Sequence, residues 1–355
     1  MYRPGIVAII EMDIAPWQEP VRGGYPDPRS FGLTGREIGR LAAQGRGVRP
    51  PVSRLMGLMW TEADDAHTAF TLPGADWFLS SQEHVSAGPL MVLADAAFGT
   101  SLMIDLPSAT PFTTWELSMS FLKPCPAGGT IRATGYPLHD GRPLAITQVW
   151  IEDGNGERVA HGTSANMVLA RLEGFEHPGE LPDIEEPVEA TPDPWERPVM
   201  GETIPWDLWR TMPGLEILGR QIKGELPQPP IHYLTGMTLR DAEEGRVTFT
   251  MPATGWLTSP NRTVQGGAIA MLAHAALTTA VTTTLEAGAA YRPIDVKVNF
   301  LRPGIADGRD LTAHGSVIHR GRTLAVGLAD VVNADGKKVA TATGSVIVLP
   351  ERPEG

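Results

Sequence analysis

The chain has very little cysteine and no long apolar run. Cys125 is its single cysteine among 355 residues, so an internal disulfide is excluded, and we expect a reducing compartment, the cytoplasm. No apolar stretch approaches the roughly 20 residues that a membrane-spanning helix needs. The segment GIVAII at 5–10 is too short for the core of a signal peptide, and Glu11 and Asp13 follow it.

Basic residues are also few, with 29 Lys and Arg against 41 Asp and Glu, for a net charge of −12. Nucleic-acid backbones need clustered cations, so we do not expect nucleic acid as a partner. A small anionic ligand needs only a few local cations and is not excluded. The nine histidines show no metal-ligand spacing with Cys or Glu, and no phosphate loop or dinucleotide fingerprint occurs. We therefore expect neither a metal nor a cofactor.

The sequence does contain a long internal repeat. SFLKPCPAGGTIRATGYPLHDGRPLA at 120–145 returns as NFLRPGIADGRDLTAHGSVIHRGRTLA at 299–325. Equivalent residues are 179 apart, and 180 apart after a one-residue insertion near Asp310. A period of this length indicates a duplicated domain rather than a solenoid, and the chain length also favours two domains.

The composition divides the chain into four parts. Residues 1–30 are rich in Pro and Gly and are interpreted as an N-terminal arm. Residues 172–209, acidic and proline-rich for most of their length, are interpreted as a linker. The two copies of the domain are then 31–171 and 210–350.

Each copy predicts the same order of elements. A short helix at 215–224 comes first, followed by a hairpin at 237–252, which 58–73 matches in copy one. A long apolar helix follows, at 85–104 in copy one and at 264–285 in copy two, and we expect it to be buried on most sides. A strand at 295–301 and a meander turning at Gly321 and at Asp335–Gly336 complete copy two. The predicted fold class is α+β, with two tandem domains that each wrap an antiparallel sheet around a long central helix.

This order, with QGG opening the helix of copy two and FLRP ending the next strand, resembles the hotdog-fold acyl-CoA thioesterases of the PaaI-like type. The resemblance covers both copies and implies a tandem double-hotdog protein. Members of this family usually open the helix with His-Gly-Gly, carry an Asp or Glu nine residues after that His, and place a Ser or Thr seven residues before the aromatic residue of the FLRP strand. Neither copy has the whole set. Copy two matches the helix start with Gln265, Gly266 and Gly267, but has His274 and Pro293 at the other two positions; copy one has Ser86, Ala87 and Gly88, with Asp95 and Thr114.

Helix geometry explains how two incomplete copies can form one site. Residues nine apart on a helix are about 13 Å apart along its axis, so one helix cannot direct both groups at one carbonyl. Hotdog thioesterases use two antiparallel protomers, and the resemblance implies that the two copies replace them. Gln265 and Gly266 would then face Asp95 and Thr114. We expect the reciprocal site, with Ser86, Ala87, His274 and Pro293, to have decayed.

The resemblance also implies a role for each residue. Gly266, Gly267 and the Gln265 amide would bind the thioester carbonyl, Asp95 would be the general base or the nucleophile, and Thr114 would position the water or the carboxylate. His84 and Asn261, each close to the start of a long helix, are weaker pocket candidates, as is His274.

Structural explanations remain open for the same residues. Asp95 could have a structural partner, Gln265 could simply start a helix, and Thr114 could be an ordinary strand residue. The two glycines could serve close packing of the helix on the sheet, and His274 could be a hydrogen-bonded core histidine.

The expected reaction is hydrolysis of an acyl-CoA thioester to a free acid and CoA. The expected CoA-binding cations lie near strand ends and turns: Lys123, Arg142, Arg302, Arg320 and Arg322. A protein that binds acyl-CoA without cleaving it is the main alternative, and a hotdog hydratase or dehydratase is a weaker one. A homodimer of such chains is plausible, and no local motif reports the acyl group.

Overall fold

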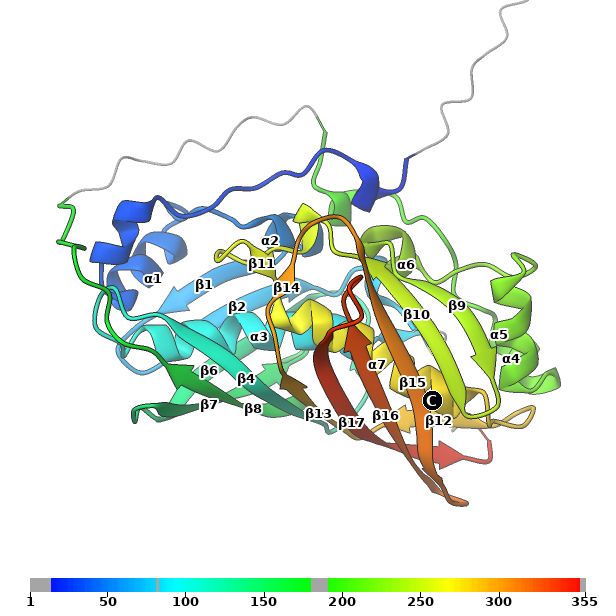
Figure 1. The fold of residues 1–355 in the computed structure, drawn as a ribbon. Helices are drawn as coiled ribbons and strands as arrows, with labels where there is room; N and C mark the ends of the chain where they lie inside the picture. Colours follow the sequence, from blue (N-terminus) through cyan, green and yellow to red (C-terminus); the bar gives the residue numbers. More distant parts are fainter. Residues whose placement is uncertain (1–13, 81–82, 180–190, 352–355) are drawn as a thin grey trace, which may run out of the picture.

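Two long helices packed antiparallel form the centre of the structure (Figure 1). The computed structural model describes residues 14–80, 83–179 and 191–351. Helix α3 (Ala87–Met103) and helix α7 (Gly266–Thr282) carry apolar residues on every side, so most of each helix is buried, as the sequence predicts. Glycines let the two backbones approach closely. A Cβ on Gly88 would lie 2.5 Å from Met271 Cγ, and one on Gly267 would lie 2.6 Å from Val92 Cα. The repeat exchanges these two contacts, so it relates the helices by a pseudo-twofold axis.

A 13-stranded antiparallel sheet wraps around this helix pair, in the order β1-β2-β6-β7-β8-β4-β13-β17-β16-β15-β10-β9, with β12 paired to β17. The strands of copy one are β1 (Met59–Ala63), β2 (Thr68–Pro73), β4 (Phe112–Phe121), β6 (Thr130–His139), β7 (Leu144–Glu152) and β8 (Arg158–Val168). Those of copy two are β9 (Thr238–Glu243), β10 (Arg246–Pro252), β12 (Ala290–Pro293), β13 (Asp295–Phe300), β15 (Asp310–Arg320), β16 (Leu324–Val332) and β17 (Lys338–Leu349). Two further pairs form separate small sheets, β3 (His84–Val85) with β5 (Cys125–Pro126), and β11 (Thr263–Val264) with β14 (Gly304–Ile305).

The two copies join through equivalent strands. In the β4–β13 pair Leu117 is opposite Val298, and the pairing runs from Asp295 to Asn299. This pairing makes one continuous sheet from two domains, and the arrangement confirms the predicted α+β fold with two tandem hotdog units.

Short helices lie before the hairpin in each copy: α1 (Gly35–Ala43) and α2 (Pro51–Met56) in copy one, and α4 (Trp206–Thr211), α5 (Gly214–Ile222) and α6 (Pro230–Thr235) in copy two. The helix predicted at 215–224 is therefore confirmed as α5. The hairpin predicted at 237–252 is confirmed as β9 and β10, with its turn at Glu244–Gly245. None of the helices within the described ranges is long and apolar enough to cross a bilayer.

The arm and the linker prove to be equivalent parts of the repeat. Residues 16–23 read PWQEPVRG and residues 194–201 read PWERPVMG. Each forms a 3-10 helix, η1 (Pro16–Gln18) and η4 (Pro194–Glu196). Each also accepts a hydrogen bond from a buried indole of the opposite copy, because Trp256 donates to the Glu19 carbonyl (3.0 Å) and Trp77 to the Arg197 carbonyl (3.1 Å). Helix η1 packs on α6 and η4 packs on α2, so the arm covers copy two and the linker covers copy one.

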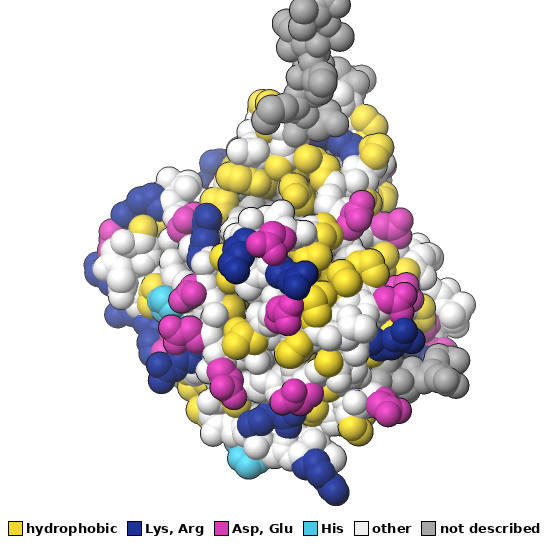
Figure 2. Space-filling model, turned by 90° about the vertical axis from the view of Figure 1, so that its right-hand side faces the viewer, with side chains coloured by type: hydrophobic (Ala, Val, Ile, Leu, Met, Phe, Trp, Pro, Cys, Tyr) yellow, Lys and Arg dark blue, Asp and Glu magenta, His cyan; other side chains and the backbone are white. Residues whose placement is uncertain are grey.

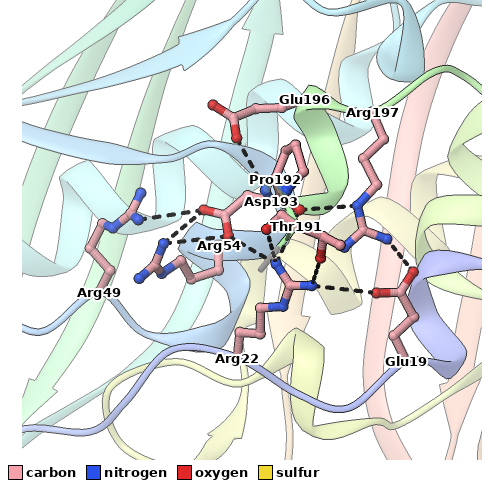
Figure 3. A network of polar contacts seen from close by, with 9 residues as sticks. All are labelled: Glu19, Arg22, Arg49, Arg54, Thr191, Pro192, Asp193, Glu196 and Arg197. Atoms are coloured by element: carbon pink, nitrogen blue, oxygen red, sulfur yellow. Dashed lines mark hydrogen bonds and ion pairs between the residues drawn. The ribbon is translucent and has the colours of Figure 1, made fainter. Parts of the chain in front are cut away.

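A buried ionic network holds the linker in this place (Figure 3). The Asp193 carboxylate is buried and pairs with Arg54 (3.1 Å) and Arg49 (3.4 Å). Arg197 on the other side of η4 pairs with Glu19 of the arm. The network therefore connects the arm, the linker and α2. Residues 1–13 and 180–190, which include the GIVAII segment, lie outside the described residues.

Candidate functional site

Asp95 of copy one faces the start of α7 of copy two. Its carboxylate accepts hydrogen bonds from the backbone N–H groups of Gly266 and Gly267, the first two residues of α7. A Cβ on Gly266 would lie 3.0 Å from Asp95 Oδ1 and 3.3 Å from Oδ2. The structure thus brings together the acid and the helix start that the sequence assigns to different copies. Below, Asp95, Gln265, Gly266 and Gly267 are called the Asp95 site.

Burial makes the Asp95 carboxylate a stronger base. Asp95 is only partly exposed, and desolvation raises the pKa of its carboxyl from 3.8 to about 6, although the two glycine N–H groups act in the opposite direction. A carboxylate with this pKa is mostly ionised at neutral pH and binds a proton more strongly than an ordinary Asp. This combination suits a general base.

Gln265 lies at the N-cap position of α7, but its side chain makes no capping hydrogen bond. Its Nε2 donates instead to the Val92 carbonyl of α3 (3.2 Å), and its buried Oε1 has no hydrogen-bond partner among the described residues. The side chain therefore bridges the two helices, with a free acceptor close to Asp95, since Val92 lies one helical turn before that residue.

The two glycines serve helix–helix contact rather than packing on the sheet. A Cβ on Gly267 would lie 2.6 Å from both the Met91 carbonyl oxygen and Val92 Cα. Side chains cannot approach backbone atoms so closely, so Gly267 is required for the distance between α3 and α7. That same distance allows both N–H groups to reach Asp95.

Thr114 lies on β4 and is not a direct partner of Asp95. Its hydroxyl donates to Asn166 Oδ1 on the neighbouring strand β8 (2.9 Å), and Asn166 is fully buried. The sequence analysis missed Asn166. Its only signal was a strongly polar residue inside a strand with alternating apolar positions, where Asn is disfavoured.

The reciprocal junction, at the start of α3, contains a cavity of about 250 Å³ lined by Ser86, Ala87, His274 and Pro293, among others. We call this space the His274 cavity. It lacks the acid, as the sequence predicts, but the expectation of a merely decayed site is incomplete because the space is retained. His84 of β3 also lines it, so His84 lies at this junction and not at the Asp95 site.

His274 is buried in the wall of this cavity, with its ring edge-on to Phe121 (5.7 Å between ring centroids). Burial lowers the pKa of the His274 imidazole to about 4, so the ring is neutral at neutral pH. Its Nε2 has no hydrogen-bond partner among the described residues. The interpretation of His274 as a hydrogen-bonded core histidine is therefore wrong at this atom.

The cations proposed for CoA do not gather at one place. Arg142 is exposed in the β6–β7 turn, whereas Arg320 and Arg322 are exposed in the β15–β16 turn of the other copy. Arg302 donates to the Lys338 carbonyl (2.6 Å), and Lys123 lines the His274 cavity.

The remaining pocket candidate, Asn261, and the described charged residues on one face of the molecule also form no cationic patch. Asn261 is exposed in the turn before β11, where its N–H donates to Ser259 Oγ (3.3 Å). On the face beside α4, α5 and β9, Lys and Arg are interspersed with Asp and Glu (Figure 2).

Comparison with known proteins agrees with the double-hotdog fold. A family model described as the thioesterase superfamily matches residues 82–160 and 261–340, one segment in each copy. A search of the curated proteins gives no significant match.

Three similar solved structures share the fold along most of the chain. The TesB protein of Mycobacterium avium subsp. paratuberculosis is 13% identical over 84% of this chain and 98% of its own, with a TM-score of 0.52. Acyl-CoA thioesterase II of Mycobacterium marinum is 13% identical over 86% and 99%, with a TM-score of 0.51. A protein described as having a hot dog fold, from Alicyclobacillus acidocaldarius, is 14% identical over 86% and 100%, with a TM-score of 0.50. With a family match in each copy and this fold along most of its length, the chain belongs to the thioesterase superfamily, as a tandem double-hotdog member.

Proposed function

We propose that this protein hydrolyses an acyl-CoA thioester to the free acid and CoA at the Asp95 site. The observation that carries the proposal is the position of the Asp95 carboxylate, which lies against the first two N–H groups of α7 from the other copy. A base and a pair of oxyanion donors at the positive end of a helix are the groups that thioester hydrolysis needs.

The proton transfers follow from these contacts. Asp95 takes a proton from a water molecule whose oxygen attacks the thioester carbonyl, and negative charge passes to the carbonyl oxygen. Protonated Asp95 is a weaker acceptor, so the N–H groups of Gly266 and Gly267 are released toward the new oxyanion. Collapse of the tetrahedral intermediate breaks the C–S bond, and the CoA thiolate takes the proton back from Asp95. The alternative in which Asp95 itself attacks and forms an anhydride uses the same donors.

Two further side chains assist in this proposal. The free Oε1 of Gln265 accepts a hydrogen bond from the attacking water and holds it beside Asp95. Thr114 acts through its neighbour Asn166, so we assign Thr114 a positioning role on β4.

One observation favours the alternative of a protein that binds acyl-CoA without cleaving it. In the structure both glycine N–H groups are bonded to Asp95, and the Gln265 amide donates to Val92, so a substrate carbonyl has to compete for its donors. An assay decides between the two functions. The purified chain is incubated with acyl-CoAs of increasing length and with aryl-acyl-CoAs, and CoA release is followed with a thiol reagent.

Turnover that disappears in Asp95→Asn supports hydrolysis at this site. Tight binding of every acyl-CoA without CoA release supports the binding protein.

We further propose that the reaction needs no cofactor, because CoA is part of the substrate, and that the protein works in a reducing compartment such as the cytoplasm. A homodimer of the chain is part of the same proposal, and light scattering tests it.

A further inference from the structure

The His274 cavity is not used by the proposed hydrolysis. It occupies the position equivalent to the Asp95 site under the repeat, with His274 in place of the acid. His274 is eight residues after Gly266, so it lies about 12 Å further along the axis of α7. The two sites are therefore separate places on one pair of helices.

The cavity is lined by both apolar and polar side chains. Leu90, Phe249 and Met271 contribute apolar surface, and Trp209 and Leu218 approach from the segment that precedes β9. His274, whose buried Nε2 has no hydrogen-bond partner among the described residues, and the first residues of α3 also line it. A buried polar atom without a partner is costly and uncommon, and on a residue that lines a cavity it points to a ligand that completes the hydrogen bond.

The charges around the cavity favour an acidic ligand group. Lys123 and Arg292 line the cavity and are more exposed than His274, and no Asp or Glu is found among the described residues of the lining. Lys123 is paired with Glu157 and Asp153, whereas Arg292 donates to the neutral Leu122 carbonyl. The 17-residue helix α3 also directs its positive end into the cavity.

The volume limits the size of the ligand. An apolar cavity of about 150 Å³ holds benzene, which corresponds to about 25 Å³ for each carbon. On that scale the 250 Å³ of this cavity accommodates about ten non-hydrogen atoms. A straight-chain acid of about eight carbons has this size.

We propose that the His274 cavity is a second ligand site that binds a free carboxylic acid of this size, with its carboxyl group against His274 and the start of α3. A carboxyl group can satisfy either tautomer of the neutral imidazole, because it donates when protonated and accepts when ionised. A thioester carbonyl can only accept. The site binds its ligand without hydrolysis, since the described part of its lining has no carboxylate to activate water. The ligand would then belong to the same class as the reaction product, and this part of the inference rests on the proposed function. The binding itself does not.

Calorimetric titration of the full chain with sodium octanoate tests the proposal, with octanamide as the neutral analogue. We expect octanoate to bind at least about tenfold more tightly than octanamide. His274→Phe keeps an aromatic ring against Phe121 but removes the polar atom, and Ala275→Leu places a larger side chain in the cavity wall. Each should weaken octanoate binding about tenfold or more, and thermal melts confirm that the variants fold.

Ala96→Leu is the matched control, because Ala96 is the repeat equivalent of Ala275 and follows Asp95 directly. It should leave octanoate binding unchanged. Absence of octanoate binding at millimolar concentration, equal binding of octanamide, or binding that only Ala96→Leu abolishes would overturn the proposal. Should His274→Phe fail to fold, Ala275→Leu decides. Because the heat of binding is measured directly, a chain that binds octanoate but hydrolyses nothing would refute the proposed function and leave this site standing.

Discussion

Replacing Asp95 by Asn should abolish hydrolysis. It should also remove the contribution of this carboxyl to the pH dependence of the free energy of unfolding. The folded protein holds the pKa of this carboxyl at about 6, against 3.8 without its surroundings. Between these values the folded state binds more protons than the unfolded state, so ionisation of Asp95 lowers the stability of the wild type as the pH rises through this window. The shift corresponds to about 3 kcal/mol at most, at about 1.4 kcal/mol per pH unit.

The amide introduced by Asp95→Asn cannot ionise, so the free energy of unfolding of this variant should rise relative to that of the wild type between pH 4 and pH 7. Because Asp95 is partly exposed, we expect a relative gain of about 1–3 kcal/mol. For a chain of this length that gain is about 1–4 °C in the melting temperature. Loss of one glycine hydrogen bond shifts the difference by about 1 kcal/mol at every pH, which leaves its slope unchanged.

Urea unfolding of both proteins at several pH values measures this difference, and the thiol assay measures kcat/KM on the same samples. We expect kcat/KM of the variant to fall at least about 100-fold, and that of the wild type to decline as the pH drops through about 6. Asp76→Asn, at an exposed aspartate in the same copy, is the control and should change neither quantity. Parallel stability curves for Asp95→Asn and the wild type, or a variant that retains turnover, would refute the reasoning.

Three other substitutions test the surroundings of the site. Gly267→Ala would place a Cβ 2.6 Å from the backbone of α3, so we expect the free energy of unfolding in urea to fall by about 1–3 kcal/mol and kcat to fall with it. Gly219→Ala, in a helix with free space around this position, is the control and should be neutral or stabilising. Equal losses in both variants would contradict the idea that Gly267 sets the distance between α3 and α7. Gln265→Glu adds a second carboxylate beside Asp95, so the acid limb of the pH–rate profile should move to higher pH; an unchanged limb would place the Gln265 side chain away from the base. Asp193→Asn removes the negative charge that faces the buried Arg54 guanidinium, and we expect a loss of about 1–3 kcal/mol with kcat nearly unchanged. A loss below about 1 kcal/mol would show that the network in Figure 3 is not stabilising.

The local pattern of the sequence was sufficient for the elements, and the family resemblance added the main contact of the site. The apolar helices, the hairpins and the meander follow from periodicity and turn residues, and each is found close to its expected position. The meeting of Asp95 with Gly266 follows from helix geometry together with the family resemblance, because one helix cannot bring its start and its ninth residue to one point.

Other features depended on segments that meet only in the folded chain. The sequence analysis missed the repeat of PWQEPVRG as PWERPVMG, and the exchange of these motifs between the copies depends on which indole each carbonyl meets. The contact between Thr114 and Asn166 depends on the register of β4 against β8. Neither contact is encoded within a few neighbouring residues.

The sequence by itself determined that the chain is a duplication whose copies differ at the helix start and at the acid. Together with the family resemblance, it also predicted that one junction would combine Asp95 with Gly266. Only the tertiary structure decided that the other junction keeps a cavity, lined by a histidine whose Nε2 has no hydrogen-bond partner among the described residues. The physical reason is that a residue type is a local property, whereas a cavity volume is set by how side chains from α3, α5, α7 and the sheet fill the space between them.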